Sequence, residues 1–261
     1  MPELPDVEYY RRYLESTAMR KKIKSVEVQN AKVLEGVSAK KLAKVLKNKK
    51  FTSTHRRGKN LFVSFAKDKC LYMHFGMTGE LKYFKGDEKE PDHARVLFGF
   101  SNGYRLAFMN QRLLGKVSVT GPADEVIAEK DLGPDALEIS YEDFKKGIKG
   151  KIGAVKSALM DQSILSGVGN IYADEILFHA RIHPKTTPKK LSGNALKRIY
   201  RNMKKILEKA IEKKADPDKF PRTWIIPARG EKEKCPRCGG GIKRIKISGR
   251  SSYFCPRCQK K

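Results

Sequence analysis

Two pairs of cysteines near the end of the chain constrain its fold more than any other feature. Cys235 and Cys238 form one C-x2-C pair, Cys255 and Cys258 form a second, and sixteen residues separate the two pairs. A C-x2-C turn lets two thiolates reach one ion, and four thiolates complete the tetrahedral shell that zinc prefers. Because four protein sulfurs leave no position for a reactive water, the sequence predicts one structural Zn2+ ion.

The residues between the two pairs predict a β-hairpin. Ile242–Ile247 partly alternates apolar and basic side chains, and Ser248–Ser251 supplies a turn. The zinc ion would close this hairpin at its base, with Arg250 at its tip. Cys70, the fifth cysteine, lies in an apolar stretch, and we expect it to be a small core residue. So few cysteines, mostly in close pairs, indicate metal binding in a reducing compartment rather than a disulfide scaffold.

The charge balance indicates a polyanionic partner. Among 261 residues, 56 are Lys or Arg and 29 are Asp or Glu, which gives a formal net charge of +27. A composition with 39% hydrophobic residues is that of a folded protein, so the charge does not belong to a disordered basic tail. Nucleic acid is the favoured partner. An anionic membrane surface is the weaker alternative, because no lipidation motif, secretory signal or long apolar segment accompanies the charge.

The first half of the chain is typical of β-structure. Short apolar runs at residues 61–65, 71–75, 95–100 and 106–108 are separated by glycine-containing turn signals. Many short strands at this spacing predict a sandwich or a barrel. Apolar residues at helical spacing predict flanking helices over Pro5–Ser16 and Ala39–Lys47.

The composition changes after Asp131–Asp135, where two turn-forming residues mark a boundary. Residues 141–214 have helical periodicity, and residues 215–234 carry several prolines and indicate a loop. We therefore expect an α+β multidomain protein. Its parts are an N-terminal β-sandwich domain with flanking helices over residues 1–132, a linker over 133–140, a helical domain over 141–230 and a zinc-finger hairpin over 231–261.

The first residues can carry chemistry of their own. Removal of Met1 before the small residue Pro2 would leave a free secondary amine. An α-amino group has an ordinary pKa of roughly 7.7–8.0, so part of it is neutral near pH 7 and can attack an aldehyde carbon. Glu3 stands beside it as a proton donor or acceptor. Many chains begin Met-Pro only because that start tolerates processing, so this pattern alone does not decide the function.

Three separated segments resemble one enzyme family. Met1–Glu8, Asp161–Glu175 and the four-cysteine pattern with Gly249–Cys255 are similar to the formamidopyrimidine-DNA glycosylase and endonuclease VIII family, nearer its formamidopyrimidine branch. The segments occur in the family's order and span the whole chain. The resemblance implies a base-excision repair enzyme that removes oxidised bases from damaged double-stranded DNA and cleaves the abasic site by β,δ-elimination. It also implies that the helical domain contains a helix-two-turn-helix motif.

The family pattern implies catalytic roles for three residues. Pro2 matches the nucleophile that attacks C1′ of the damaged nucleotide and forms a Schiff base. Glu3 matches the acid/base residue that assists opening of the sugar ring. Lys59, in the run Arg56–Lys59, matches a lysine on a β-hairpin near the phosphate of the lesion.

Six further residues match positions that contact DNA. Met77, Arg112 and Leu114 match the set that fills the space left by a flipped nucleotide. The alternative for Met77 and Leu114 is a place in the core. Lys156, Asn170 and Arg250 match phosphate contacts, and Gly167 and Gly169 would let backbone amides approach a phosphate. The alternative for Asn170 is the N-cap of the helix that follows.

Two other functions stay open at this point. The chain could be a catalytically silent relative that binds damaged or abasic DNA, or a zinc-ribbon protein that binds RNA. The joint presence of Pro2, Glu3 and Lys59 favours the enzyme. We expect a monomer in the cytoplasm or nucleoid of a prokaryote or the nucleus of a eukaryote. Residues 110–115 and 215–224 depart from the family pattern, which leaves the range of lesions open.

Overall fold

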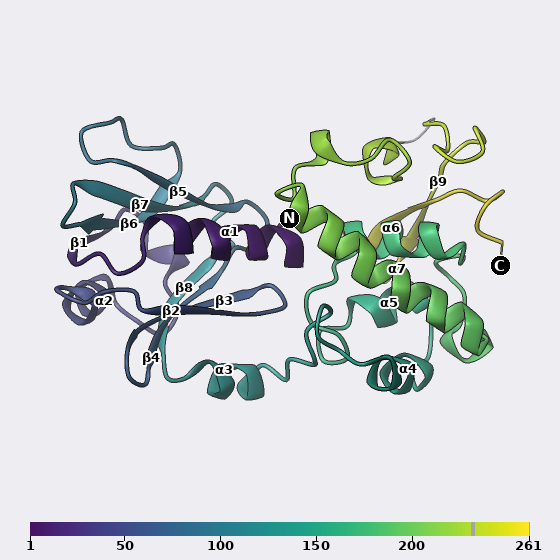
Figure 1. The fold of residues 1–261 in the computed structure, drawn as a ribbon, viewed down its shortest axis with the longest axis horizontal. Coiled ribbons are helices and arrows are strands. Elements are labelled where there is room, and N and C mark those ends of the chain that lie inside the picture. Colours follow the sequence, from purple (N-terminus) through teal and green to yellow (C-terminus); the bar gives the residue numbers. More distant parts are fainter. Residues whose placement is uncertain (231–232, 261) are drawn as a thin grey trace. The chain divides into compact units, whose positions relative to one another are not determined.

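The computed structural model describes residues 1–230 and 233–260 and packs the chain into two compact units (Figure 1). Unit 1 contains residues 1–2 and 6–130, and unit 2 contains residues 3–5 and the chain from Asp131 onward. The expected limits of the zinc-finger hairpin, residues 231 and 261, lie outside the described residues. Every helix within the described residues is too short or too polar to cross a membrane.

Unit 1 is built on two four-stranded antiparallel sheets with strand orders β1-β6-β7-β5 and β2-β3-β4-β8. Apolar side chains of both sheets, among them Leu61, Val63, Phe98 and Phe108, share one fully buried cluster. Fully burying a side chain of this size contributes roughly 1.5–3 kcal/mol to folding. The predicted β-sandwich is confirmed. Its strands are β1 (Ile23–Val28), β2 (Ser53–Arg57), β3 (Asn60–Ala66), β4 (Lys69–His74), β5 (Gly79–Lys85), β6 (Ala94–Phe100), β7 (Tyr104–Asn110) and β8 (Lys116–Thr120).

Helices flank this sandwich as the apolar spacing predicted. Helix α1 (Leu4–Thr17) buries Val7 and Leu14 in the sandwich core. Helix α2 (Ala39–Leu46) begins after Ser38, whose hydroxyl accepts a hydrogen bond from the Lys41 amide at 3.2 Å, a common helix cap. A third short helix, α3 (Ala123–Glu129), follows the last strand of the sandwich.

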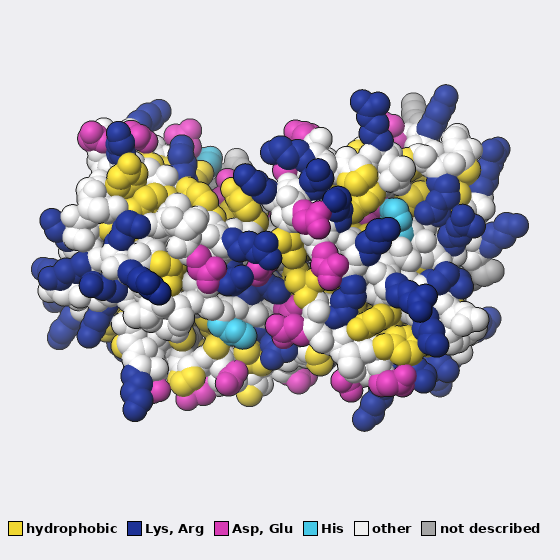
Figure 2. Space-filling view, in the orientation of Figure 1, with side chains coloured by type: hydrophobic (Ala, Val, Ile, Leu, Met, Phe, Trp, Pro, Cys, Tyr) yellow, Lys and Arg dark blue, Asp and Glu magenta, His cyan; other side chains and the backbone are white. Residues whose placement is uncertain are grey.

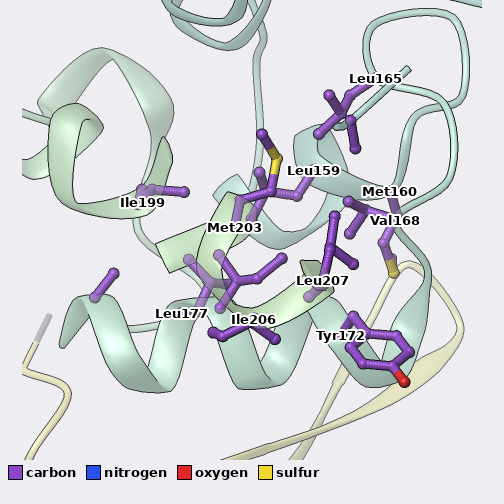
Figure 3. Close-up of a cluster of buried hydrophobic side chains, with 14 of the residues drawn as sticks. Leu159, Met160, Leu165, Val168, Tyr172, Leu177, Ile199, Met203, Ile206 and Leu207 are labelled. Carbon is purple, nitrogen blue, oxygen red and sulfur yellow. The ribbon is translucent and has the colours of Figure 1, made fainter. Parts of the chain in front are cut away.

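Unit 2 is helical, with α4 (Tyr141–Lys149), α5 (Val155–Met160), α6 (Asn170–Ala180) and α7 (Gly193–Glu212). Figure 3 shows its core, where Met203, Ile206 and Leu207 of α7 lie beside Leu177 of α6. These α7 residues lie in the segment 141–214, whose periodicity predicts helices, and all three are buried. Residues 133–140, expected as a linker, pack within unit 2, because Ala136 and Ile139 lie in the same core.

The C-terminal hairpin consists of β9 (Lys243–Ile247) and β10 (Arg250–Phe254), paired antiparallel. Ser248 and Gly249 connect the strands, and both have positive φ, at 46° and 75°. Positive φ at both residues is the conformation that a two-residue hairpin turn requires, and glycine adopts it readily. The predicted hairpin is therefore confirmed.

Candidate functional site

The carboxylate of Glu3 caps the N-terminus of α6. Its Oε2 atom accepts a hydrogen bond from the Gly169 amide at 2.7 Å and its Oε1 atom from the Ile171 amide at 2.8 Å. The Tyr172 amide adds a third bond at 3.3 Å, and Glu3 is fully buried. The first amides of a helix have no partner within the helix, and its positive end attracts anions. The helix therefore fixes both carboxylate oxygens in place.

Two glycines create the space for this contact. A Cβ atom at position 169 would lie 2.4 Å from the Glu3 carboxyl carbon, and one at position 167 would lie 2.5 Å from Cδ1 of Leu4. Gly167 also has a φ of 113°, which strains any other residue. These glycines therefore make room for residues 3 and 4. Both amides were predicted to approach a phosphate; instead, the Gly169 amide donates to Glu3 and the Gly167 amide donates to Gln162.

The turn before α6 is held by Gln162. Its Nε2 atom donates to the carbonyl of Val168 at 2.9 Å, and its Oε1 atom accepts from the Gly167 amide at 2.9 Å. Asp161 closes the start of the same turn by accepting from the Ser163 amide at 3.1 Å. Polar side chains in this short segment thus fix the backbone amides that bind Glu3.

Asn170 is the first residue of α6 rather than its cap. Gly169 occupies the cap position, and the capping side chain is that of Glu3, so the N-cap alternative for Asn170 is wrong. Its Oδ1 atom is buried and has no hydrogen-bond partner among the described residues. A buried polar atom without a partner is unusual in a folded protein. The phosphate role of Asn170 stays a prediction.

Lys156 corrects one prediction of the sequence analysis. Its side chain is fully buried, with Nζ 2.7 Å from Oδ1 of Asp174, and it donates to the Ser251 carbonyl at 3.2 Å. Burial lowers the pKa of the Lys156 ammonium, and the Asp174 carboxylate opposes that effect. An ammonium enclosed in this way does not reach a phosphate on the surface, so the expected contact is not supported.

Asp174 joins the hairpin to α6. It accepts hydrogen bonds from the Ser252 hydroxyl at 2.7 Å and from the Tyr253 amide at 3.0 Å, and it pairs with Arg229. Sequence reasoning did not single out this residue. The available signal was the adjacent acidic pair Asp174 and Glu175 in the largely apolar helix 170–180. A buried carboxylate needs such partners.

The four predicted metal ligands lie together at the base of the hairpin. All four Sγ atoms of Cys235, Cys238, Cys255 and Cys258 lie within 4.8 Å of one another. The pairs Cys235–Cys258 and Cys238–Cys255 are 3.9 and 3.5 Å apart. A zinc ion about 2.3 Å from each sulfur separates neighbouring sulfurs by about 3.8 Å. The cluster is therefore suited to one zinc ion, as predicted. Arg250 is exposed beside the turn at the opposite end of the hairpin.

Within unit 1, Lys59 lies in the tight turn between β2 and β3. Arg57 pairs with Asn60, which leaves Gly58 and Lys59 as the two turn residues, and Gly58 has a φ of 57°. The Gly58 carbonyl accepts a hydrogen bond from Nη1 of Arg56 at 3.0 Å. The Arg57 carbonyl accepts one from Nδ2 of Asn60 at 3.1 Å.

His74 is a nearby titratable residue that the sequence analysis did not select. It pairs with Asn60 across β3 and β4, and its Nδ1 atom accepts from the Gly76 amide at 3.2 Å. Burial lowers the pKa of His74, and the positive charges of Lys59 and Lys130 lower it further. A neutral imidazole that accepts at Nδ1 carries its proton on Nε2, so it can donate a hydrogen bond. A single histidine at the end of an apolar strand was the only sequence signal.

Met77 and Leu114 project from loops of unit 1, with 39% and 48% of their surface exposed. The alternative that they are core residues is therefore wrong. Arg112, also exposed, donates its amide to the Thr78 hydroxyl at 3.1 Å, which joins the two loops. Asn110 supports the second loop, because its Oδ1 atom accepts from the Leu114 amide at 3.0 Å.

Basic side chains cover much of the molecular surface. Figure 2 shows Lys and Arg spread over both units on the visible face, with fewer acidic groups among them. A surface of this kind attracts a polyanion over a long distance.

Three family models match successive parts of the chain. The formamidopyrimidine-DNA glycosylase N-terminal domain matches residues 1–117, the H2TH domain of the same glycosylase matches residues 132–220, and the zinc finger found in FPG and IleRS matches residues 232–261. A sandwich, a helical segment and a four-cysteine hairpin in this order define a class of zinc-containing DNA glycosylases.

Relatives that match 99–100% of this chain agree with these family models. The formamidopyrimidine-DNA glycosylase of Pelotomaculum thermopropionicum is 34% identical over 100% of this chain and 99% of its own length. That of Ligilactobacillus salivarius is 36% identical over 99% of each chain. That of Arabidopsis thaliana is 33% identical over 100% of this chain and 71% of its own length. The chain belongs to the formamidopyrimidine-DNA glycosylase family.

Solved structures of the family share the fold. The Lactococcus lactis Fpg in complex with DNA containing an abasic site matches with a TM-score of 0.88 and 28% identity, covering 99% of this chain and 100% of that one. MutM in complex with DNA containing carbocyclic 8-oxo-G matches with a TM-score of 0.89 and 29% identity over 100% of both chains.

Proposed function

We propose that this protein is a bifunctional DNA glycosylase and abasic-site lyase of base-excision repair, acting on oxidised bases in duplex DNA. The observation that carries the proposal is the arrangement of Glu3, which directly follows the candidate nucleophile Pro2 and is held by three backbone amides at the N-terminal end of α6. A fixed carboxylate beside a secondary amine is suited to amine attack with proton transfer.

The reaction begins once Met1 has been removed. The neutral nitrogen of Pro2 forms a bond to C1′ of the damaged nucleotide, and the bond between C1′ and the base breaks. Glu3 assists by moving a proton as the sugar ring opens, which yields an iminium ion between Pro2 and C1′. Loss of a C2′ proton from that ion then expels the 3′ phosphate, and a second elimination expels the 5′ phosphate.

Reaching C1′ requires the nucleotide to leave the base stack, at a cost of a few kcal/mol. Met77 and Leu114 are apolar and exposed, so they are suited to fill the space left in the duplex. Arg112 is suited to donate hydrogen bonds to the partner base. Lys59, Asn170 and Arg250 would contact the backbone phosphates around the lesion.

The zinc ion, when bound, supplies structure rather than chemistry. Four thiolate ligands complete its shell, and Cys235 and Cys255 pack with Phe178 in a small apolar cluster of unit 2. The hairpin is thereby fixed at its base, with Arg250 presented at the other end.

The direct test uses duplexes that carry one formamidopyrimidine, one 8-oxoguanine, one oxidised pyrimidine or one abasic site. Base release and strand nicking are measured separately for the wild-type protein and for a variant whose N-terminus carries a tag, so that residue 2 has no free amine. We expect both activities in the wild type, and loss of nicking with retained binding in the tagged variant. A wild type that binds these duplexes and cleaves none of them would instead support the silent damage-binding relative.

This function implies where the protein works. We expect it in the compartment that holds DNA, which is the cytoplasm and nucleoid of a prokaryote or the nucleus of a eukaryote. One set of the residues Pro2, Glu3 and Lys59 is present in each chain, so a monomer is sufficient for the reaction.

A further inference from the structure

We propose that Glu8 is a positioning residue for Lys59 and that it acts through Arg56 and the carbonyl of Gly58. The inference rests on the proposed function, because it concerns how that reaction's candidate lysine is held. All four residues belong to unit 1.

Glu8 is a buried carboxylate at the centre of three arginines. Its Oε1 atom accepts from Arg11 and Arg12, each at 2.8 Å. Its Oε2 atom accepts from Nε of Arg56 at 3.0 Å and from Arg11 at 2.9 Å. The side chain is 7% exposed. Because charge-assisted hydrogen bonds away from water are strong and directional, this carboxylate fixes the orientation of the Arg56 guanidinium.

Arg56, held in this orientation, bonds to the turn that contains Lys59. It is itself buried, and while Nε faces Glu8, Nη1 donates to the Gly58 carbonyl at 3.0 Å. The Gly58 carbonyl and the Lys59 amide belong to the same planar peptide unit. A hydrogen bond to that carbonyl therefore restrains the peptide plane from which the Lys59 side chain departs.

The other side of the turn is restrained in a comparable way. Asn60 donates to the Arg57 carbonyl, and its Oδ1 atom accepts from the Tyr72 hydroxyl at 2.8 Å. Both carbonyls that precede Lys59 thus accept hydrogen bonds from buried side chains. Gly58, which has a positive φ, gives the turn little stiffness of its own, so the side-chain bonds supply it.

The alternative is that Glu8 only stabilises the sandwich. A buried ion pair is weak support for stability, because its desolvation cost offsets much of the attraction. If Glu8 positions Lys59, the effect of a Glu8 substitution on the nicking rate should depend on whether Lys59 is present. A small displacement of a positioned group can cost about 100-fold in rate.

A double-mutant cycle separates the two roles. Single-turnover nicking of a duplex with one abasic site is measured for wild type, Glu8→Gln, Lys59→Ala and the double variant. We expect Glu8→Gln to reduce the rate by about 10- to 100-fold in the presence of Lys59, and by less than about twofold in the Lys59→Ala background. Equal reductions in both backgrounds, or no reduction in either, would overturn the inference.

Two further variants provide a control and a substitute for Glu8→Gln. Glu15→Gln is the matched control, because Glu15 is a carboxylate of the same helix that bonds Arg11 and Thr54 but is half exposed. We expect it to leave the rate unchanged. Arg56→Lys replaces Glu8→Gln if that variant does not fold. Lysine keeps the positive charge but cannot bond Glu8 and the Gly58 carbonyl at the same time through one planar group. We expect its effect on the nicking rate to depend on Lys59 in the same way. A wild type that nicks no substrate contradicts the proposed function, whereas an active wild type with an additive cycle contradicts this inference alone.

Discussion

The carboxylate of Glu3 accepts a hydrogen bond from the Gly169 amide at 2.7 Å, although 166 positions separate the two residues in the chain. The candidate acid/base residue is therefore also the capping group of a helix. Loss of a capping side chain costs roughly 0.5–2 kcal/mol. Stability and proton transfer are linked at this single carboxylate.

Because Gly169 contacts the Glu3 carboxylate, Gly169→Ala should slow base release. The added Cβ atom would lie 2.4 Å from the Glu3 carboxyl carbon and would displace it without changing its chemistry. We expect the rate of base release to fall by at least 100-fold, with DNA affinity nearly unchanged. Gly193→Ala is the matched control, because nothing lies within 4 Å of a Cβ atom at the start of α7. Equal rates for the two variants would contradict the role of Glu3.

Truncation of the exposed loop residue Leu114 should affect duplex substrates only. Because Leu114 is half exposed, Leu114→Ala should change the free energy of unfolding by less than about 0.5 kcal/mol. Nicking of an abasic site in a duplex should fall, since the space beside the lesion is left unfilled, whereas nicking in a single strand should not. Ile152→Ala, which alters another exposed apolar side chain, is the control. The prediction fails if both substrates are affected alike.

Removal of zinc should weaken DNA binding. Without the ion the four thiols no longer hold the base of the hairpin, and metal binding supplies much of the folding free energy of such small sites. The strand β10 would still contact Asp174 through Ser252 and Tyr253, so we expect local unfolding rather than unfolding of unit 2. Affinity for duplex DNA is compared before and after chelation, with zinc content verified. Unchanged affinity in zinc-free protein contradicts the account.

Glu8 should make unit 1 sensitive to acid. Burial alone would raise the pKa of Glu8, but hydrogen bonds from Arg11, Arg12 and Arg56 outweigh burial and lower it to about 2. Because the pKa of Glu8 is lower in the folded state than its ordinary value of 4.5, ionised Glu8 stabilises the folded state. This stabilisation is fully present above about pH 4.5 and is lost as the pH falls toward 2. The free energy of unfolding of the wild type, relative to that of Glu8→Gln, should therefore fall by about 3 kcal/mol between pH 6 and pH 2. Urea unfolding at several pH values measures it, and a constant difference would exclude this role.

Local patterns in the sequence predicted much of the fold. Cysteine spacing identified the zinc ligands, and apolar spacing identified α1, α2 and α7, because each depends on residues close together in the chain. Strands β1 (Ile23–Val28), β2 (Ser53–Arg57), β5 (Gly79–Lys85) and β8 (Lys116–Thr120) escaped prediction, since none of them is a continuous apolar run. β1 and β2 are also mostly exposed or half-buried. β1 is defined by its pairing with the distant strand β6, and β2 by its pairing with β3, the next strand in the chain.

The site was predicted less completely, for the same physical reason. Sequence similarity pointed to Glu3 and Lys59, but it did not indicate that Glu3 caps α6 or that Glu8 orients Arg56 beside the turn. Lys156 was expected to contact a phosphate because its position matches the family pattern, and its burial depends on the partner Asp174. Such contacts between remote segments have no local signal.

The central claim is that the nitrogen of Pro2 attacks C1′. It is tested most directly by borohydride trapping on a duplex with a single abasic site, followed by mass spectrometry of the peptide linked to DNA. Reduction converts the iminium ion into a stable amine. The account predicts a covalent adduct on Pro2 of the processed chain and none with a chain whose N-terminus is blocked by a tag. An adduct on a lysine, or no adduct from a protein with a processed N-terminus and intact DNA binding, would contradict it.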